Sequence, residues 1–122
     1  MAFIKYNPNP DNNLVGDCVI RGICILTGKS WEKVYIPLCL EGLQLHDMPS
    51  SNRVWSSYLT KRGFTKSVIP NCPDCYSVRV FCRDHPEGTY LLCTGTHVIG
   101  CIDGDYYDTW DSGDESPMYY FK

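Results

Sequence analysis

Residues 16–28 form the best-defined local unit of the sequence, and they predict a helix that begins at a cysteine. Gly-Asp-Cys opens the segment, and an almost wholly apolar run follows as far as Gly28. Asp17 is a favourable N-cap residue, because its carboxylate can accept hydrogen bonds from the free N–H groups of the first turn. Gly28 suits the left-handed position that ends many helices. The apolar residues recur at helical spacing, so we expect most of this helix to be buried.

The position of Cys18 predicts a reactive thiol. Cys18 falls in the first turn of the expected helix, where the positive end of the helix dipole favours a thiolate over a thiol. Gly22, one turn further on, has no side chain and lets another backbone approach closely. The alternative for Cys18 is an ordinary core cysteine, because free cysteine is among the most buried residue types. A base beside the thiol would favour catalysis.

His97 is the candidate base. Residues 95–102 predict a strand, Asp103-Gly104 is a strong signal for a two-residue hairpin turn, and residues 106–110 predict the returning strand. In that register His97 and Asp108 become diagonal neighbours on one face, which they share with Trp110.

The length of the turn decides which carboxylate accompanies the histidine. A loop one residue longer would reverse the parity and bring Asp111 opposite His97. We favour the two-residue turn and therefore expect Asp108 to orient the imidazole. Taken singly, His97 is better explained as a structural histidine and Asp108 as a solvated strand residue. Only Cys18, His97 and Asp108 together indicate a catalytic triad.

The order of these elements resembles the papain-like cysteine peptidases, especially their small bacterial and phage branch close to the C39-like peptidases. The resemblance spans residues 12 to 111 and rests on three motifs: Gly16-Asp17-Cys18, Thr96-His97-Val98 and Asp108-Thr109-Trp110. The last motif looks like the family's Asn-Ser-Trp, with Asp in place of Asn. The resemblance implies a papain-like fold, in which a tryptophan at the position of Trp110 shields the histidine–carboxylate contact from water.

The same resemblance implies a thiol hydrolase that acts on a peptide or isopeptide bond of a peptide or protein substrate. In the family, a Gln six residues before the cysteine helps to form the oxyanion hole. That position is Asn12 here, with Asn13 beside it as an alternative. Related papain-like folds also perform deamidation and acyl transfer. A further reading is a catalytically inactive binding or inhibitory module, which the change from Gln to Asn favours.

Composition limits the remaining possibilities. With 122 residues the chain predicts a single domain, residues 1–122, with a real core. The net charge of −3 makes nucleic acid an unexpected partner. No run approaches the ~20 apolar residues of a membrane helix, so we expect no membrane partner. The eight cysteines and the lack of a signal-peptide pattern lead us to expect a cytoplasmic protein with reduced thiols. We expect no cofactor.

Zinc is the alternative use of four of these side chains. Cys72 and Cys75 form one C-x2-C pair, and Cys82 and His85 form a second pair with the same spacing. The four side chains together could bind zinc tetrahedrally. Only six residues separate the pairs, whereas common zinc sites leave about a dozen or more. We therefore predict no metal site and keep a zinc-stabilised interaction domain as the weaker reading.

The rest of the chain predicts an α+β domain with N-terminal helices packed on a C-terminal antiparallel sheet. Residues 1–13, rich in Pro and Asn, form a non-helical lead. Three more helices are expected, at residues 30–42 with Pro37 shortening or kinking the helix, 52–62 and 77–84. Three more strands are expected, at residues 64–69, 89–94 and, as a final edge strand, 116–121.

Overall fold

The computed structural model describes residues 2–70 and 76–122, and this part of the chain forms an α+β domain. Its helices are α1 (Cys18–Thr27), α2 (Trp31–Leu45), α3 (Asn52–Lys61) and α4 (Val78–Asp84). Its strands are β1 (Phe3–Lys5), β2 (Lys66–Val68), β3 (Thr89–Cys93), β4 (Val98–Ile102), β5 (Asp105–Asp108) and β6 (Tyr119–Phe121). The strands form one sheet in the order β1-β5-β4-β3-β6-β2. None of the helices in the described ranges is long and apolar enough to cross a membrane.

The sheet is mixed, whereas the sequence predicted an antiparallel one. β1 pairs with β5 in parallel, with Phe3 opposite Tyr106, and the other pairs of neighbouring strands are antiparallel. Residues 2–13 of the lead are non-helical, as predicted, but the strand at Phe3–Lys5 was not predicted. A strand of three residues that pairs about a hundred positions further on leaves no local pattern to detect, because strand formation depends on the partner.

β6 lies inside the sheet rather than at its edge. It is bonded to β3 on one side and to β2 on the other, so β2 forms the edge that the sequence assigned to residues 116–121. Phe121 explains the interior position, because it is buried and packs edge-on against Trp55 of α3 with ring centroids 5.5 Å apart. β6 therefore packs against α3 and forms part of the core between the helices and the sheet.

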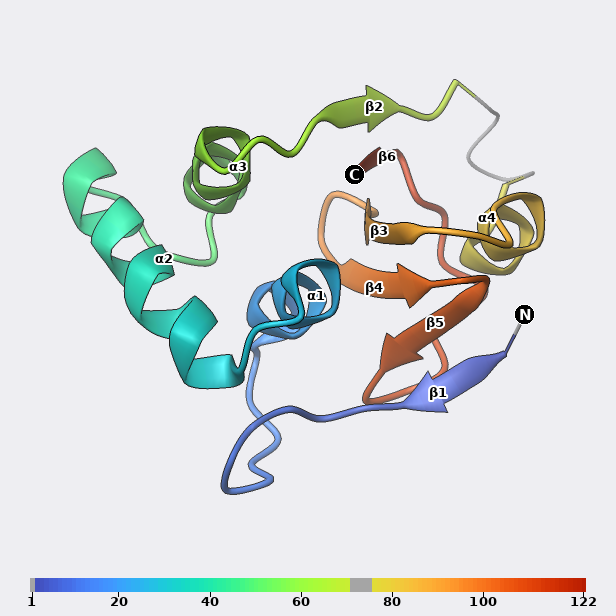
Figure 1. Ribbon diagram of the computed structural model, residues 1–122, viewed down its shortest axis with the longest axis horizontal. Helices are drawn as coiled ribbons and strands as arrows, with labels where there is room; N and C mark the ends of the chain where they lie inside the picture. The colour runs from blue at the N-terminus through green and yellow to red at the C-terminus, as the bar shows by residue number, and fades with distance from the viewer. Residues whose placement is uncertain (1, 71–75) are drawn as a thin grey trace.

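Helices cover both faces of the sheet. Leu91 and Val98 pack with α1 in one core cluster, whereas the alternate residues Leu92 and Ile99 pack with α4 in another. Figure 1 shows α2 and α3 on the same side as α1, well away from α4. The expectation that the N-terminal helices pack on the sheet is thus met by α1, while α4 covers the opposite face.

Two glycines let α1 approach β3 and β4 closely. A Cβ atom at Gly22 would lie 2.3 Å from Cδ1 of Leu91, and one at Gly100 would lie 2.5 Å from Cβ of Ile25. Both distances are far shorter than a carbon–carbon contact allows. The predicted close approach at Gly22 is made by the side chains of Leu91 and Val98 rather than by a backbone. It brings the start of α1 to the end of the sheet where β4 begins.

α2 is longer than predicted. It continues through Pro37 and Gly42 to Leu45, whereas the sequence predicted an end at Gly42. Val34 and Leu38 anchor the helix in the core, so packing compensates for the hydrogen bond that Pro37 cannot donate. Gly42 is needed inside the helix, because a Cβ atom there would lie 2.7 Å from the carbonyl oxygen of Asp47 as the chain turns back.

Candidate active site

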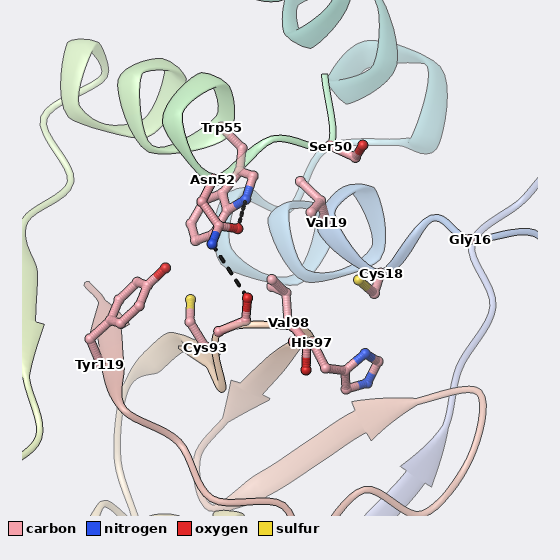
Figure 2. A pocket seen from close by; sticks show the side chains of 12 residues that line it. Gly16, Cys18, Val19, Ser50, Asn52, Trp55, Cys93, His97, Val98 and Tyr119 are labelled. Atoms are coloured by element: carbon pink, nitrogen blue, oxygen red, sulfur yellow. Dashed lines mark hydrogen bonds between the residues drawn. The ribbon is translucent and has the colours of Figure 1, made fainter. Parts of the chain in front are cut away.

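Cys18 and His97 lie together in the wall of a cavity of about 210 Å³ between the helical layer and the sheet. Figure 2 shows both at one end of this cavity, with Asn52, Trp55 and Tyr119 at the other end. The full lining is Gly16, Cys18, Val19, Ser50, Asn52, Trp55, Cys93, Gly95, Thr96, His97, Val98 and Tyr119. Cys18 is the first residue of α1, as the sequence predicted.

Asp17 precedes α1, but it plays a different part from the predicted cap. Its carboxylate accepts hydrogen bonds from the side chains of Arg21 and Trp31 rather than from the backbone of α1. Asp17 is buried, and a guanidinium in hydrogen-bond contact is a stronger partner for a buried carboxylate than a backbone N–H group. Gly28 ends the helix in the left-handed conformation, with φ of 71°, as predicted.

The β4–β5 hairpin brings His97 and Asp108 into contact. Asp103 and Gly104 both have positive φ, which is typical of the tight two-residue turn, and Ile102 pairs with Asp105 as the sequence predicted. His97 Nε2 lies 2.6 Å from Asp108 Oδ2. The other ring nitrogen, Nδ1, is therefore the one left to serve Cys18.

Asp108 is fixed by several donors besides His97. Its Oδ1 accepts hydrogen bonds from Nη2 of Arg21 at 3.0 Å and from the backbone N–H of Thr109 at 2.8 Å. Its Oδ2 also accepts one from the hydroxyl of Ser112 at 2.7 Å. Burial alone would raise the pKa of Asp108, but the hydrogen bonds from His97 and Ser112 and the positive charge of His97 hold it below its usual value. The carboxylate therefore stays ionised although it is almost fully buried.

Asp111, the alternative partner of the histidine, is engaged elsewhere. Its Oδ1 accepts a hydrogen bond from the hydroxyl of Tyr106 at 2.6 Å, and Arg79 forms an ion pair with its carboxylate at 3.0 Å. The geometry thus places Asp108, and not Asp111, against His97.

The electrostatics of the pair favour a thiolate and an imidazolium. Burial alone would raise the pKa of Cys18, but hydrogen bonds with the His97 side chain and the Val98 backbone, together with the positive charges of His97 and Arg21, lower it. Burial alone would lower the pKa of His97, but its hydrogen bonds with Asp108 and Cys18 and their negative charges raise it to about 9. Near neutral pH the two shifts act in the same direction, toward the ion pair.

Trp110 stands beside the histidine, where the resemblance implied it. Its ring centroid lies 5.2 Å from that of His97, at an interplanar angle of 31°. Trp110 is about half exposed, so one side of the indole faces solvent while the other covers the imidazole.

The structure does not bring Asn12 to the cavity. Asn12 and Asn13 are exposed in the lead between β1 and α1, where the side-chain amide of Asn7 bonds Oδ1 of Asn12 and the carbonyl of Asn13. The amide that does line the cavity belongs to Asn52 at the start of α3. Its Oδ1 accepts from Trp55 Nε1 and its Nδ2 donates to the Gly95 carbonyl (Figure 2). Asn12 as an oxyanion donor stays a prediction.

Sequence reasoning missed the polar side chains that support the triad. Arg21 is buried although it belongs to an otherwise apolar helix, and it follows Asp17 by four residues. A lone arginine in such a helix, at the spacing of an ion pair, is a signal that was available. Ser112 carries no such signal, because it lies in a loop and reaches Asp108 only through the tertiary fold.

Two of the four candidate zinc ligands have other partners. Cys82 Sγ lies 3.2 Å from Cys101 Sγ, and His85 Nδ1 lies 2.8 Å from the carbonyl oxygen of Phe81. Cys72 and Cys75 fall outside the described residues. Within residues 2–70 and 76–122, no cluster of His, Cys, Asp and Glu is arranged to hold a metal ion.

Comparison with known proteins adds no relative. No protein-family model, no curated protein and no solved structure matches this chain. The class of protein must therefore be argued from the geometry of Cys18, His97 and Asp108 alone.

Proposed function

We propose that this chain is a thiol hydrolase of the papain-like fold that cleaves a peptide or isopeptide bond with a Cys18-His97-Asp108 triad. The observation that carries the proposal is the arrangement at the cavity: the carboxylate of Asp108 holds Nε2 of His97 at 2.6 Å, and Cys18 lies in the same cavity wall as His97. A nucleophile, its base and an orienting carboxylate in this relation are the usual signature of acyl transfer.

The chemistry follows from these positions. The thiolate of Cys18 attacks the carbonyl carbon, and the oxyanion forms beside the backbone N–H of Cys18 at the free first turn of α1. The C–N bond then breaks, and His97 gives its proton to the leaving amine. Water next attacks the thioester while His97 accepts its proton; the C–S bond breaks, which releases the acid and restores the thiolate of Cys18 and the imidazolium of His97.

The cavity limits the substrate. Apart from the Cys18–His97 pair, the side chains that line it carry no formal charge. Burying an unpaired charge there would be costly, so we expect an uncharged group beside the scissile bond of a peptide or protein substrate. A thiolate mechanism also needs reduced Cys18, and we therefore place the protein in the cytoplasm.

Incubation with a peptide library derived from a proteome, followed by mass spectrometry, tests the proposal. We expect new peptide termini with the wild type and none with Cys18→Ala. Cys39→Ala is the matched control, because Cys39 is partly exposed on α2 and does not line the cavity. Equal cleavage by wild type and Cys18→Ala would reject the proposal. If the peptides instead gained about one mass unit without being cleaved, and only with Cys18 present, the reaction would be deamidation and not hydrolysis of the peptide bond.

The position of Asn12 outside the cavity favours one second candidate, a binding module that keeps the triad geometry without turnover. In that case Cys18→Ala would bind the same peptides as the wild type, and neither protein would change them.

A further inference from the structure

Arg21 is a buried cation between two buried carboxylates. Its side chain is 7% exposed, and one terminal nitrogen pairs with Asp17 while the other pairs with Asp108. Burying an ion pair seldom stabilises a fold more than apolar side chains of similar size would. The ion pairs of Arg21 therefore call for an explanation beyond stability, and their connection to the triad supplies one.

The contacts form a single line of groups whose charges alternate in sign. Cys18 lies beside His97 in the cavity wall, and Nε2 of His97 lies 2.6 Å from the carboxylate of Asp108. Arg21 then joins Asp108 to the carboxylate of Asp17. Each charge in this line acts on the ones beyond its neighbour, because screening is weak where water is excluded.

Asp17 ends the line and ties it to the second helix. Its Oδ2 accepts a hydrogen bond from Nε1 of Trp31 at 2.9 Å, and Trp31 stacks on Tyr35 with ring centroids 4.8 Å apart. The charge of Asp17 is therefore held in place against Arg21 from both α1 and α2.

We propose that Arg21 is a positioning residue that acts through Asp108, and that Arg21 and Asp17 together set the pH range in which the Cys18–His97 pair is charged. The proposal rests on the proposed function, because it assigns a purpose to the ion pair of that site. Arg21 faces Asp17 before α1 and Asp108 on β5, and its positive charge also lowers the pKa of Cys18.

The signs of the two charges make opposite predictions. Loss of the positive charge of Arg21 removes an attraction for the thiolate and a repulsion for the imidazolium, so both groups should titrate at higher pH. Loss of the negative charge of Asp17 should do the reverse. A merely structural role would instead weaken the site in the same way for both substitutions.

The test is the pH profile of iodoacetamide alkylation at Cys18, measured by peptide mass mapping on the full chain. The variants are Arg21→Met, Arg21→Lys and Asp17→Asn. Arg79→Met is the matched control, because Arg79 also pairs with two carboxylates, Asp111 and Asp114, but contacts neither His97 nor Asp108. Thermal unfolding of each variant checks that it is folded.

We expect Arg21→Met to move the profile to higher pH and to slow alkylation on its acidic limb roughly tenfold, the factor that corresponds to one charge-assisted hydrogen bond. Asp17→Asn should move the profile to lower pH, and Arg21→Lys and Arg79→Met should stay close to the wild type. If Arg21→Met does not fold, the profile of Asp17→Asn still tests the proposal, because it should move to lower pH. Two results with folded variants would overturn the proposal. One is that the profiles coincide with that of the wild type, and the other is that Arg21→Met and Asp17→Asn shift the profile in the same direction.

The result separates this proposal from the proposed function. If Cys18 in the wild type alkylates no faster than an ordinary thiol, the proposed function fails. If the wild type shows an activated thiol while Arg21→Met and Asp17→Asn leave its profile unchanged, only the role of Arg21 fails.

Discussion

Asp108 shows how single side chains decide the properties of this site. Four groups donate to its carboxylate: the His97 ring, the Arg21 guanidinium, the Ser112 hydroxyl and the Thr109 backbone. A carboxylate held in this way cannot rotate away from the imidazole and cannot easily take up a proton, since every hydrogen bond it accepts favours the charged form. Much of the order of the triad therefore comes from residues outside it.

Ser112→Ala tests this support. Ser112 is fully buried, and loss of its hydroxyl removes one donor to Asp108, so we expect a loss of about 1–2 kcal/mol in the free energy of unfolding. We also expect slower alkylation of Cys18 near neutral pH. Ser57→Ala is the control, because the Ser57 hydroxyl donates to Glu41 at 2.6 Å, remote from the triad. Urea unfolding and alkylation rates check both: equal alkylation in the two variants would contradict the account.

At the scale of elements, the site depends on how closely α1 packs on the sheet. Gly22 on the helix and Gly100 on β4 remove the side chains that would keep the two apart. The distance between α1 and β4 in turn sets the distance between Cys18, at the first turn of α1, and His97, just before β4. Packing in the middle of α1 thus controls the separation of Cys18 and His97 at its start.

Gly100→Ala should damage both packing and site. The added Cβ atom would lie 2.5 Å from Cβ of Ile25, so α1 or β4 must move, at a cost of about 1–3 kcal/mol in the free energy of unfolding. The measurement is chemical unfolding, with Gly16→Ala as the control, because no atom lies within 4 Å of a Cβ atom at Gly16. A Gly100→Ala protein as stable as the control would mean that the close approach is not needed.

The elements that the sequence predicted are those with local signals. Each of these elements carries its own start or stop residues: Gly28 ends α1, Ser77 caps α4, and Asp103-Gly104 forms the turn between β4 and β5. β1 and the interior place of β6 were not predictable in this way. Their strands are three residues long, and their hydrogen-bond partners lie far away in the chain.

At the scale of the whole molecule, the candidate site is a product of the contact between its two layers. The nucleophile comes from the helical layer, while the base lies just before β4 and the carboxylate at the end of β5, about eighty to ninety positions later in the sequence. The sequence predicted which three residues meet, because their motifs and the hairpin register are local. It did not predict the cavity, which is closed by Asn52, Trp55 and Tyr119 from α3 and β6.

The stability of the fold should depend on pH through His97. Its pKa is raised from 6.5 to about 9 in the folded state, so the contribution of His97 is complete below pH 6.5 and is lost as the pH rises through about 9. We therefore expect the difference in free energy of unfolding between the wild type and His97→Ala to shrink between pH 6.5 and 9. Urea unfolding across this range measures it. A difference that stays constant or grows would contradict the raised pKa.

The rate of iodoacetamide alkylation at Cys18 as a function of pH, in the wild type and in His97→Ala, tests the central claim most directly. Partly exposed Cys39 serves as the internal reference. The lowered pKa of Cys18 and the raised pKa of His97 predict that Cys18 reacts much faster than Cys39 near pH 6 and that His97→Ala abolishes this advantage. If wild-type Cys18 instead titrates as an ordinary thiol with a pKa of about 8.5, no activated cysteine–histidine pair exists and the hydrolase proposal fails.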